Sequence, residues 1–424
     1  HTFNAGNSIY KAAAVKDEWL VEDYQGNTLH PNVYGGSYYL DPANPEVLSF
    51  VESIYVEMAQ KYDFAGIQFD YIRYYDNNYA ATPIRDSGYG EYPEKKFKEA
   101  YQLEGDVRTL ILDPQIRKKW NEWRADNITA AVKKFSEAIR AVKKDILISA
   151  DVVANVNLAR NTYMQDRPTW VSAGYIDLLC PMIYTGSTTV VTADAQTIKN
   201  RLDNLSFLAT GIAPLYYGYP IEVNLEQINA ANDFGGASIF ASQNIIGNKD
   251  IEASLCDGIY RLPSISPLTD PALVFAAAMS DLCAYYSYYR DACGDNYDIL
   301  KEKMNEIIAM KCENPADYQK IMEKLNHLSL LTAYLDNDEV QNNLKIKIHR
   351  LTDTLDIKIS REMIALGYYD PKSGSRPDPE LFDYPSGDSS PNPEPKKGCF
   401  RSNGIIISGL IGLLYLKRKD LFSL

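Results

Sequence analysis

The sequence predicts a parallel α/β fold followed by a smaller all-helical region. Short apolar runs alternate with amphipathic helical segments up to about residue 241, which is typical of a parallel sheet built from βα units. Beyond about Pro267 the helical period continues without strands. The chain has 424 residues, whereas single cores seldom grow past about 250 to 300 residues. More than one region is therefore expected.

The first helix and the strand after it are the clearest elements. Asn44 is a good N-cap and is followed by a proline, so a helix is expected to begin there and to run to about Tyr62. A short apolar strand follows over residues 64–69 and ends in Asp70. Ligands bind at the carboxyl ends of parallel strands, so an acid at this position is a candidate for chemistry. On these residues alone, Asp70 is equally well explained as an ion-pair partner of Arg73 that holds a loop.

The remaining α/β elements follow in order. A polar excursion over residues 77–113, with one short helix near 93–103, precedes the longest expected helix at 113–144. Such long excursions from a compact domain are usually functional. A strand at 146–150 again ends in an acid, Asp151. Further elements are expected as a helix within 160–173, strand 176–184, helix 192–205, strand 208–216, helix 225–232 and strand 237–241. Five clear strands leave an open doubly wound sheet and a (β/α)8 barrel as alternatives.

Composition excludes several classes of function. The 43 Lys and Arg residues against 56 Asp and Glu give a net charge of -13, which argues against a nucleic-acid partner. The six cysteines and four histidines show no metal-ligand spacing, so no metal and no cofactor is expected, although one or two disulfides remain open. The 32 tyrosines suit sugar stacking, but tyrosine also fills half-exposed packing positions.

The C-terminal third divides into three regions. Residues 267–367 are expected to form a helical bundle, with helices at 271–290, 297–312, 315–335 and 338–366. Residues 368–397 are rich in Pro, Ser, Gly and Asp, which predicts a disordered spacer. Residues 398–424 hold an apolar stretch followed by three basic residues, which is typical of a membrane or cell-wall sorting segment. The stretch is shorter than the about 17 to 25 residues of a spanning helix, and the basic end is expected to stay cytoplasmic, with the folded regions outside.

Four motifs are informative together. They are residues 40–47 (LDPANPEV), 66–74 (GIQFDYIRY), 160–166 (RNTYMQD) with Trp170, and 176–184 (IDLLCPMIY). This set resembles the bacterial glycosyl hydrolase-like 10 family, over roughly residues 1–262. The resemblance implies a (β/α)8 TIM barrel over residues 1–266, with a glycan-cleaving or glycan-binding site. It also implies that the strand at 64–69 is the fourth barrel strand, so the first two strands are missing and the chain looks N-terminally truncated.

A pair of carboxylates is what glycoside hydrolysis requires. Asp70 and Asp151 are expected at the ends of adjacent strands, on one rim, and are the predicted catalytic residues. Arg73 is expected to lower the pKa of Asp70 and keep it ionised, whereas Asp151 needs a raised pKa to act as the acid. The alternative for Asp151 is a loop-capping role. Asp177 begins its strand at the opposite rim and is expected to be structural.

Substrate contacts are predicted around the two acids. The predicted substrate-binding residues are Tyr71, Arg73, Gln165, Asp166, Trp170 and Tyr184. Each aromatic ring in this set is equally compatible with rim packing, and Glu222 is a reserve acid.

The leading hypothesis is an enzyme, a glycoside hydrolase attached to the cell envelope by its C-terminal tail. Its expected substrate is a polysaccharide, with the glycan strands of peptidoglycan as one option. The alternative is a non-catalytic surface protein that binds carbohydrate on a barrel scaffold. A third and weaker reading makes the barrel a spacer and the bundle over 267–367 a protein-binding module.

Overall fold

The structure is a computed structural model that describes residues 1–6, 16–28, 37–75, 86–261, 265–368 and 405–407. The chain separates into two compact units. The first comprises His1–Tyr184 with Thr189–Arg201, and the second comprises Thr185–Thr188 together with the chain after Leu202. Each unit is described by itself.

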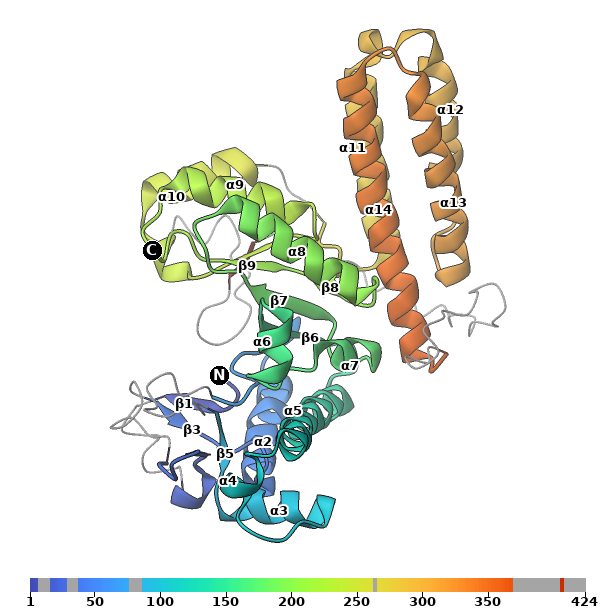
Figure 1. Cartoon of the computed structure of the whole chain (residues 1–424). Helices are drawn as coiled ribbons and strands as arrows, with labels where there is room; N and C mark the ends of the chain where they lie inside the picture. Colours follow the sequence, from blue (N-terminus) through green and yellow to red (C-terminus); the bar gives the residue numbers. More distant parts are fainter. Residues whose placement is uncertain (7–15, 29–36, 76–85, 262–264, 369–404, 408–424) are drawn as a thin grey trace. The chain divides into compact units, whose positions relative to one another are not determined.

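The first unit contains a parallel sheet, which confirms the predicted α/β class. Its strands are β4 (Gly66–Phe69), β6 (Leu147–Val153) and β7 (Leu178–Met182), and β6 pairs in parallel with both others. Helices α2 (Pro45–Lys61) and α5 (Pro114–Val142) lie side by side (Figure 1). Phe69 of β4 packs against Tyr55 of α2 and Phe135 of α5, at ring-centroid distances of 5.0 and 6.1 Å. One face of this sheet is therefore covered by the two helices.

Both helices begin where their caps predict. The Asn44 side chain accepts a hydrogen bond of 2.9 Å from the Glu46 amide, and a proline occupies the first turn. Asp113 caps α5 in the same way, accepting 2.7 Å from the Gln115 amide. These bonds satisfy amides that the helix itself leaves without partners.

The polar excursion is better ordered than the sequence predicted. It contains β5 (Ser87–Tyr89), α3 (Glu91–Tyr101) and α4 (Val107–Leu110), so the predicted short helix is present. Tyr89 and Phe97 pack with Trp120 of α5 in a small separate core. The prediction of an irregular segment is therefore wrong for residues 86–113, its functional role stays a prediction, and residues 76–85 lie outside the described residues.

Short elements complete the first unit. They are β1 (Asn4–Gly6), η1 (Asp17–Trp19), β2 (Glu22–Asp23), β3 (Tyr38–Tyr39), α6 (Val156–Asn161), α7 (Arg167–Ser172) and α8 (Thr188–Leu202). β1 pairs antiparallel with β3, and β2 pairs antiparallel with β5. The helix predicted within residues 160–173 is present as α7, and the chain turns at Met164, which has a φ of +62°, between α6 and α7.

The second unit contains further parallel strands. Its elements are β8 (Phe207–Leu208), β9 (Thr210–Ile212), α9 (Ile221–Asn232), β10 (Ala237–Ile239), η2 (Ser242–Asn244), α10 (Lys249–Ala253), η3 (Ser254–Ile259) and β11 (Ile405–Ile407). β10 pairs in parallel and in register with β9, and also with β11. The strand predicted at 208–216 ends at Ile212, because Pro214 has no amide hydrogen for a ladder.

Four helices of the second unit form a bundle (Figure 1). They are α11 (Pro271–Tyr288), α12 (Tyr297–Ile308), α13 (Pro315–Leu331) and α14 (Asp338–Ala365), with short turns η4 (Arg290–Ala292), η5 (Gly294–Asn296) and η6 (Thr332–Tyr334). Apolar side chains of all four helices make one core, which includes Met279, Met304, Leu325 and Leu355. All four predicted helices are thus present. The domain boundary between 266 and 267 stays a prediction.

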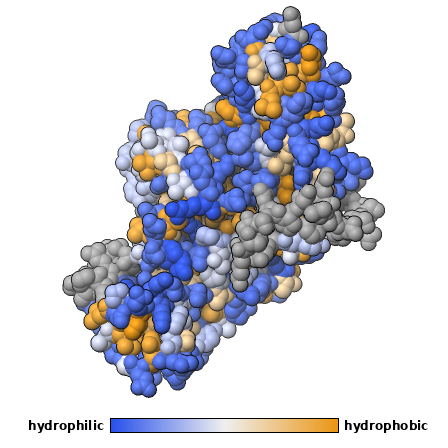
Figure 2. Space-filling view, turned by 45° about the vertical axis from the view of Figure 1, so that its right-hand side comes forward, coloured by the Kyte–Doolittle hydropathy of each residue, from blue (hydrophilic) through white to orange (hydrophobic). Residues whose placement is uncertain are grey.

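The expected spacer and tail fall largely outside the described residues. This applies to 369–404 and 408–424, so the predictions of disorder and of a membrane-directed end are not addressed there. Among the helices that the structure describes, none is both long and apolar enough to cross a bilayer. The five described cysteines are all free thiols. The face shown in Figure 2 is mostly hydrophilic, with groups of hydrophobic residues between the hydrophilic ones.

Candidate active site

The sheet of the first unit has a polar face opposite its helix-covered face. Paired residues of parallel strands point to the same side, and the register sets Gln68 beside Ser149 and Asp151 beside Cys180. Side chains alternate along a strand, so Asp70 lies on the same side as Gln68 and opposite to Phe69. Both predicted acids therefore project from one face of the sheet, away from α2 and α5.

Asp151 lies inside a strand, not at the end of one. The prediction of a strand ending at residue 150 is wrong, because β6 continues to Val153. Phe69 is paired with Ala150, so Asp70 and Asp151 follow one residue later on neighbouring strands. Strand spacing then sets their α-carbons about 5 Å apart. The predicted carboxylate pair is thus brought together by register.

The Asp151 carboxyl is buried and holds one strong hydrogen bond. Gln68 Nε2 donates to Asp151 Oδ2 at 2.7 Å, while Gln68 Oε1 accepts from Ser149 Oγ at 3.1 Å. Burial, reinforced by the negative charge of Asp70, raises the pKa of Asp151 to about 8. The bond from Gln68 and the charge of Arg73 oppose this rise. Asp151 is therefore protonated at neutral pH, as the acid of a carboxylate pair must be.

Asp70 is more accessible than Asp151 and sits against the chain's first residues. Its Oδ1 accepts from the Tyr71 amide at 2.7 Å, and its Oδ2 lies 3.3 Å from His1 Nε2. Burial raises the pKa of Asp70, and the positive charge of Arg73 acts in the opposite direction. Arg73 lowers the pKa of Asp70 as expected, but the loss of solvation outweighs the guanidinium charge, so the pKa of Asp70 is raised overall.

Arg73 is held between tyrosine rings. Its guanidinium carbon lies 4.4 Å from the ring centroid of Tyr71 and 5.7 Å from that of Tyr163. Its Nη1 is buried and has no hydrogen-bond partner among the described residues. Tyr71 adopts a φ of +54°, which is unusual for a residue other than glycine. Such local strain is often found at functional sites.

Further tyrosines surround the acids. Burial raises the pKa of Tyr184, and the charges of Asp151 and Asp70 raise it further, so the predicted contact Tyr184 lies within electrostatic range of both carboxyls. The ring centroids of Tyr39 and Tyr75 lie 4.1 Å apart, with the ring planes tilted by 35°. The site is therefore lined by amphipathic rings.

Two of the predicted substrate contacts are buried and have structural partners. Gln165 is buried and spans the main chain, accepting from the Val153 amide at 2.8 Å and donating to the Asp151 carbonyl at 3.2 Å. Trp170 is fully buried, and its Nε1 donates to Thr129 Oγ1 at 3.0 Å. A ring without exposed surface offers no face to a sugar, so the structure places Trp170 in the core.

The other acids named from the sequence belong to other elements of the fold. Asp166 is partly exposed and lies 3.4 Å from Arg160. Asp177 Oδ2 accepts 2.8 Å from the Ile148 amide, near the start of β6, so it fastens neighbouring strands as expected of a structural residue. Glu222 lies in the first turn of α9, in the second unit.

Several site residues were missed by sequence reasoning. Gln68 precedes Asp70 by two residues, so strand alternation was a sufficient signal for it. Cys180 is buried opposite Asp151, where burial raises the pKa of its thiol. Tyr39, Tyr75 and Tyr163 come from separate segments, and no sequence spacing brings them together.

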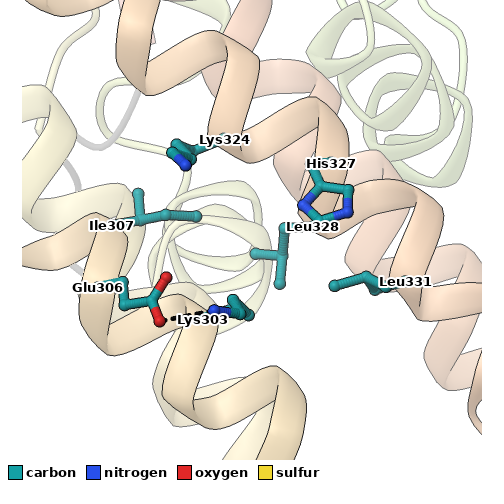
Figure 3. Close-up of a pocket in the computed structure, with 7 residues that line it drawn as sticks. All are labelled: Lys303, Glu306, Ile307, Lys324, His327, Leu328 and Leu331. Carbon is teal, nitrogen blue, oxygen red and sulfur yellow. Dashed lines mark hydrogen bonds and ion pairs between the residues drawn. The ribbon is translucent and has the colours of Figure 1, made fainter.

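A shallow pocket on the bundle is a weaker candidate (Figure 3). It is lined from α12 by Lys303, Glu306 and Ile307, and from α13 by Lys324, His327, Leu328 and Leu331. Its single carboxylate, Glu306, already bonds Lys303 Nζ at 2.6 Å. Without a second acid, this pocket does not offer a carboxylate pair.

Comparisons with known proteins give a family match and several relatives. Residues 6–230 match the family described as glycosyl hydrolase-like 10. Glycosyl hydrolase DigH of Escherichia coli K12 is 25% identical over 166 residues, which cover 35% of this chain and 32% of that protein. DigH of Shigella flexneri matches to the same extent. The chain thus spans about a third of the length of the curated relatives it matches.

Solved structures give more distant likenesses. The PgaB (BpsB) glycoside hydrolase domain from Bordetella bronchiseptica aligns with a TM-score of 0.45 and 14% identity, over 56% of this chain and 68% of that one. A cycloisomaltooligosaccharide glucanotransferase from Paenibacillus aligns with a TM-score of 0.31 and 13% identity, over 50% of this chain and 25% of that one. The family match spans both acid-bearing strands and more than half of the sequence, and on that ground the chain belongs to the glycosyl hydrolase-like 10 family.

Proposed function

We propose that this protein hydrolyses glycosidic bonds of a polysaccharide, with Asp151 as the general acid and Asp70 as the nucleophile or general base. The observation that carries the proposal is the carboxylate pair on neighbouring parallel strands. The two groups influence each other electrostatically, and the pKa of Asp151 is raised to about 8. Membership of a glycosyl hydrolase-like family and likeness to proteins named glycosyl hydrolase support the same reaction class.

Each acid has a chemically distinct task. Two carboxyls on adjacent strands resist simultaneous ionisation, so near neutral pH the pair holds one proton. The more deeply buried Asp151 keeps this proton and donates it to the glycosidic oxygen as the bond to the anomeric carbon breaks. Asp70, with Arg73 nearby, supplies the carboxylate that attacks that carbon or takes a proton from the attacking water.

The wider setting belongs to the proposal as well. The parallel strands are taken as parts of a (β/α)8 barrel, whose carboxyl-end loops would hold the substrate. Peptidoglycan glycan strands are the first substrate to test. We place the protein in the cell envelope, anchored through residues 398–424, because that segment combines an apolar stretch with a basic end.

Two substitutions test the mechanism. Asp70→Asn and Asp151→Asn, made in the full chain, are expected to reduce release of reducing ends from purified glycan strands by about a thousandfold or more. Melting temperature and circular dichroism report whether each variant folds. Asp63→Asn is the matched control, because Asp63 is fully exposed and precedes the same strand.

The outcomes separate the competing functions. Undiminished turnover by a folded Asp70→Asn variant removes Asp70 from the mechanism. Glycan binding by the unsubstituted chain with no product released supports instead a non-catalytic carbohydrate-binding protein.

A further inference from the structure

The second unit carries a group of exposed tyrosines that the mechanism above does not use. Tyr216, Tyr217 and Tyr219 follow β9, with 48%, 56% and 44% of their surfaces exposed. Phe240 follows β10, and β9 and β10 are parallel neighbours, so all four rings lie beyond the carboxyl ends of these strands. The Tyr216 ring centroid lies 5.0 Å from that of Phe240 and 5.2 Å from that of Tyr217.

The loop that carries these tyrosines is fixed by its own main chain. The amide of Tyr217 donates to the Ala213 carbonyl at 3.3 Å, and the amide of Tyr219 donates to the Pro214 carbonyl at 3.0 Å. Gly218 between them has a φ of +76°, a conformation that glycine adopts without strain. The main chain that carries the tyrosines is therefore held in one conformation, which lowers the entropy lost when a ligand binds.

The Tyr219 ring also packs against the main chain of Gly186. A β-carbon at Gly186 would lie 2.6 Å from Tyr219 Cε1 and from its hydroxyl oxygen, so the ring lies directly against the Gly186 main chain. The turn containing Gly186 is tied to α9, since Gln227 Nε2 donates to the Thr185 carbonyl at 2.8 Å. One side of the ring is thus covered, while nearly half of its surface stays open.

The chemistry of the loop favours a carbohydrate. The segment Ala213-Pro214-Leu215-Tyr216-Tyr217-Gly218-Tyr219-Pro220 contains no charged residue. It therefore offers no ion pair to a charged peptide, and the net charge of -13 disfavours nucleic acid. Tyrosine combines an apolar ring face with a hydroxyl, which matches the C–H faces and hydroxyl groups of a sugar.

We propose that Tyr216, Tyr217 and Tyr219 form a tyrosine platform that binds a polysaccharide chain by stacking. The choice of a glycan as the ligand rests on the proposed function, but binding at the platform does not depend on catalysis. The platform therefore gives this chain a second place to hold its substrate, separate in sequence from the carboxylate pair.

Binding is tested in the full chain carrying Asp70→Asn and Asp151→Asn, by co-sedimentation at low temperature. The probes are purified peptidoglycan, chitin and cellulose. Adding Tyr216→Ala or Tyr219→Ala is expected to weaken binding by about tenfold each. Gly186→Ala keeps every tyrosine but displaces the Tyr219 ring, and it is expected to weaken binding to a similar degree. Tyr288→Ala removes a tyrosine that is 82% exposed on the bundle and is expected to change nothing.

The results distinguish this proposal from the proposed function. Normal binding by folded Tyr216→Ala and Tyr219→Ala variants overturns the platform, even if the carboxylate variants are inactive. Failure of the parent chain to bind any of the three probes also overturns it. If the carboxylate variants remain active while the tyrosine variants lose binding, the platform stands and the assignment of the acids falls.

Discussion

Gln68 offers the sharpest test of the acid assignment. Its Nε2 donates to Asp151 Oδ2 at 2.7 Å, and a donor of this kind stabilises the ionised carboxylate. The bond therefore lowers the pKa of Asp151 against the larger effect of burial. Gln68→Met removes the donor and keeps a side chain of similar length. The pKa of Asp151 must then rise, and Asp151 must keep its proton to higher pH.

The size of the shift follows from the bond. A hydrogen bond to a charged group contributes about 1.5 to 3 kcal/mol, and one pKa unit corresponds to about 1.4 kcal/mol. Loss of the Gln68 bond is therefore expected to move the pKa of Asp151 from about 8 upward by roughly one to two units. Little solvent reaches the buried carboxyl to replace the lost donor.

The shift is measured as the basic limb of the pH profile of kcat/KM, which reports the acid of the free enzyme. Titration of carbon-labelled aspartate by NMR, assigned with Asp151→Asn, gives the same pKa without requiring turnover. Ser149→Ala is the control, because Ser149 bonds Gln68 and leaves the Gln68–Asp151 bond in place. A folded Gln68→Met variant whose limb and titration stay at the parent pH would falsify the assignment of Asp151 as a hydrogen-bonded acid.

Three further predictions follow from the same geometry. Folding raises the pKa of Asp151 from 3.8 to about 8, so the parent chain loses stability as pH rises between these values. The melting temperature of Asp151→Asn should therefore rise relative to that of the parent from pH 4 to pH 9. A difference in melting temperature that stays constant with pH contradicts this. Arg73→Met removes the charge that lowers the pKa of Asp70, so the acidic limb of the pH profile of kcat/KM should move to higher pH. Arg73→Lys keeps the charge and should largely restore the parent profile. Equal pH profiles for the two variants exclude a charge effect. Trp170→Phe should lower the free energy of unfolding, measured by chemical denaturation, by about 1 to 3 kcal/mol, because the bond to Thr129 is lost. The KM should stay unchanged. A raised KM in a stable variant would return Trp170 to the substrate contacts.

The elements that follow local rules were predictable from sequence. Asn44 and Asp113 cap their helices through contacts within two residues, which sequence displays directly. The acids Asp70 and Asp151 were found because each belongs to an apolar strand. Their pairing depends on register between strands eighty residues apart, which sequence indicates only through strand order.

What escaped prediction depends on burial. The pKa of Asp70 depends on two opposing effects, the loss of solvation and the charge of Arg73. Residue spacing reveals only the charge. Trp170 has an aromatic ring of the kind that stacks on sugars, yet it is fully buried in the core. A sequence shows which groups a strand carries, whereas the depth of each group is decided by the whole fold.

Buried acids in the first unit show why the carboxylate pair stands out. Asp86 is buried too, but its Oδ2 lies 2.9 Å from Arg117 and 2.6 Å from Arg124, as in an acid retained for structure. Asp41 has a pKa raised to about 7 by burial, and it accepts a bond from the Ala43 amide in a tight turn, with Glu22 as the acid that influences it.

Burial or a raised pKa alone therefore does not mark a catalytic acid. Asp151 differs because its carboxyl receives one amide donor and, among the described residues, no ion pair within 4 Å, while a second acid follows at the same position of the neighbouring strand. Such an arrangement costs stability above about pH 4. Its presence is best explained by the proton that Asp151 holds and by the charge that Asp70 places beside it.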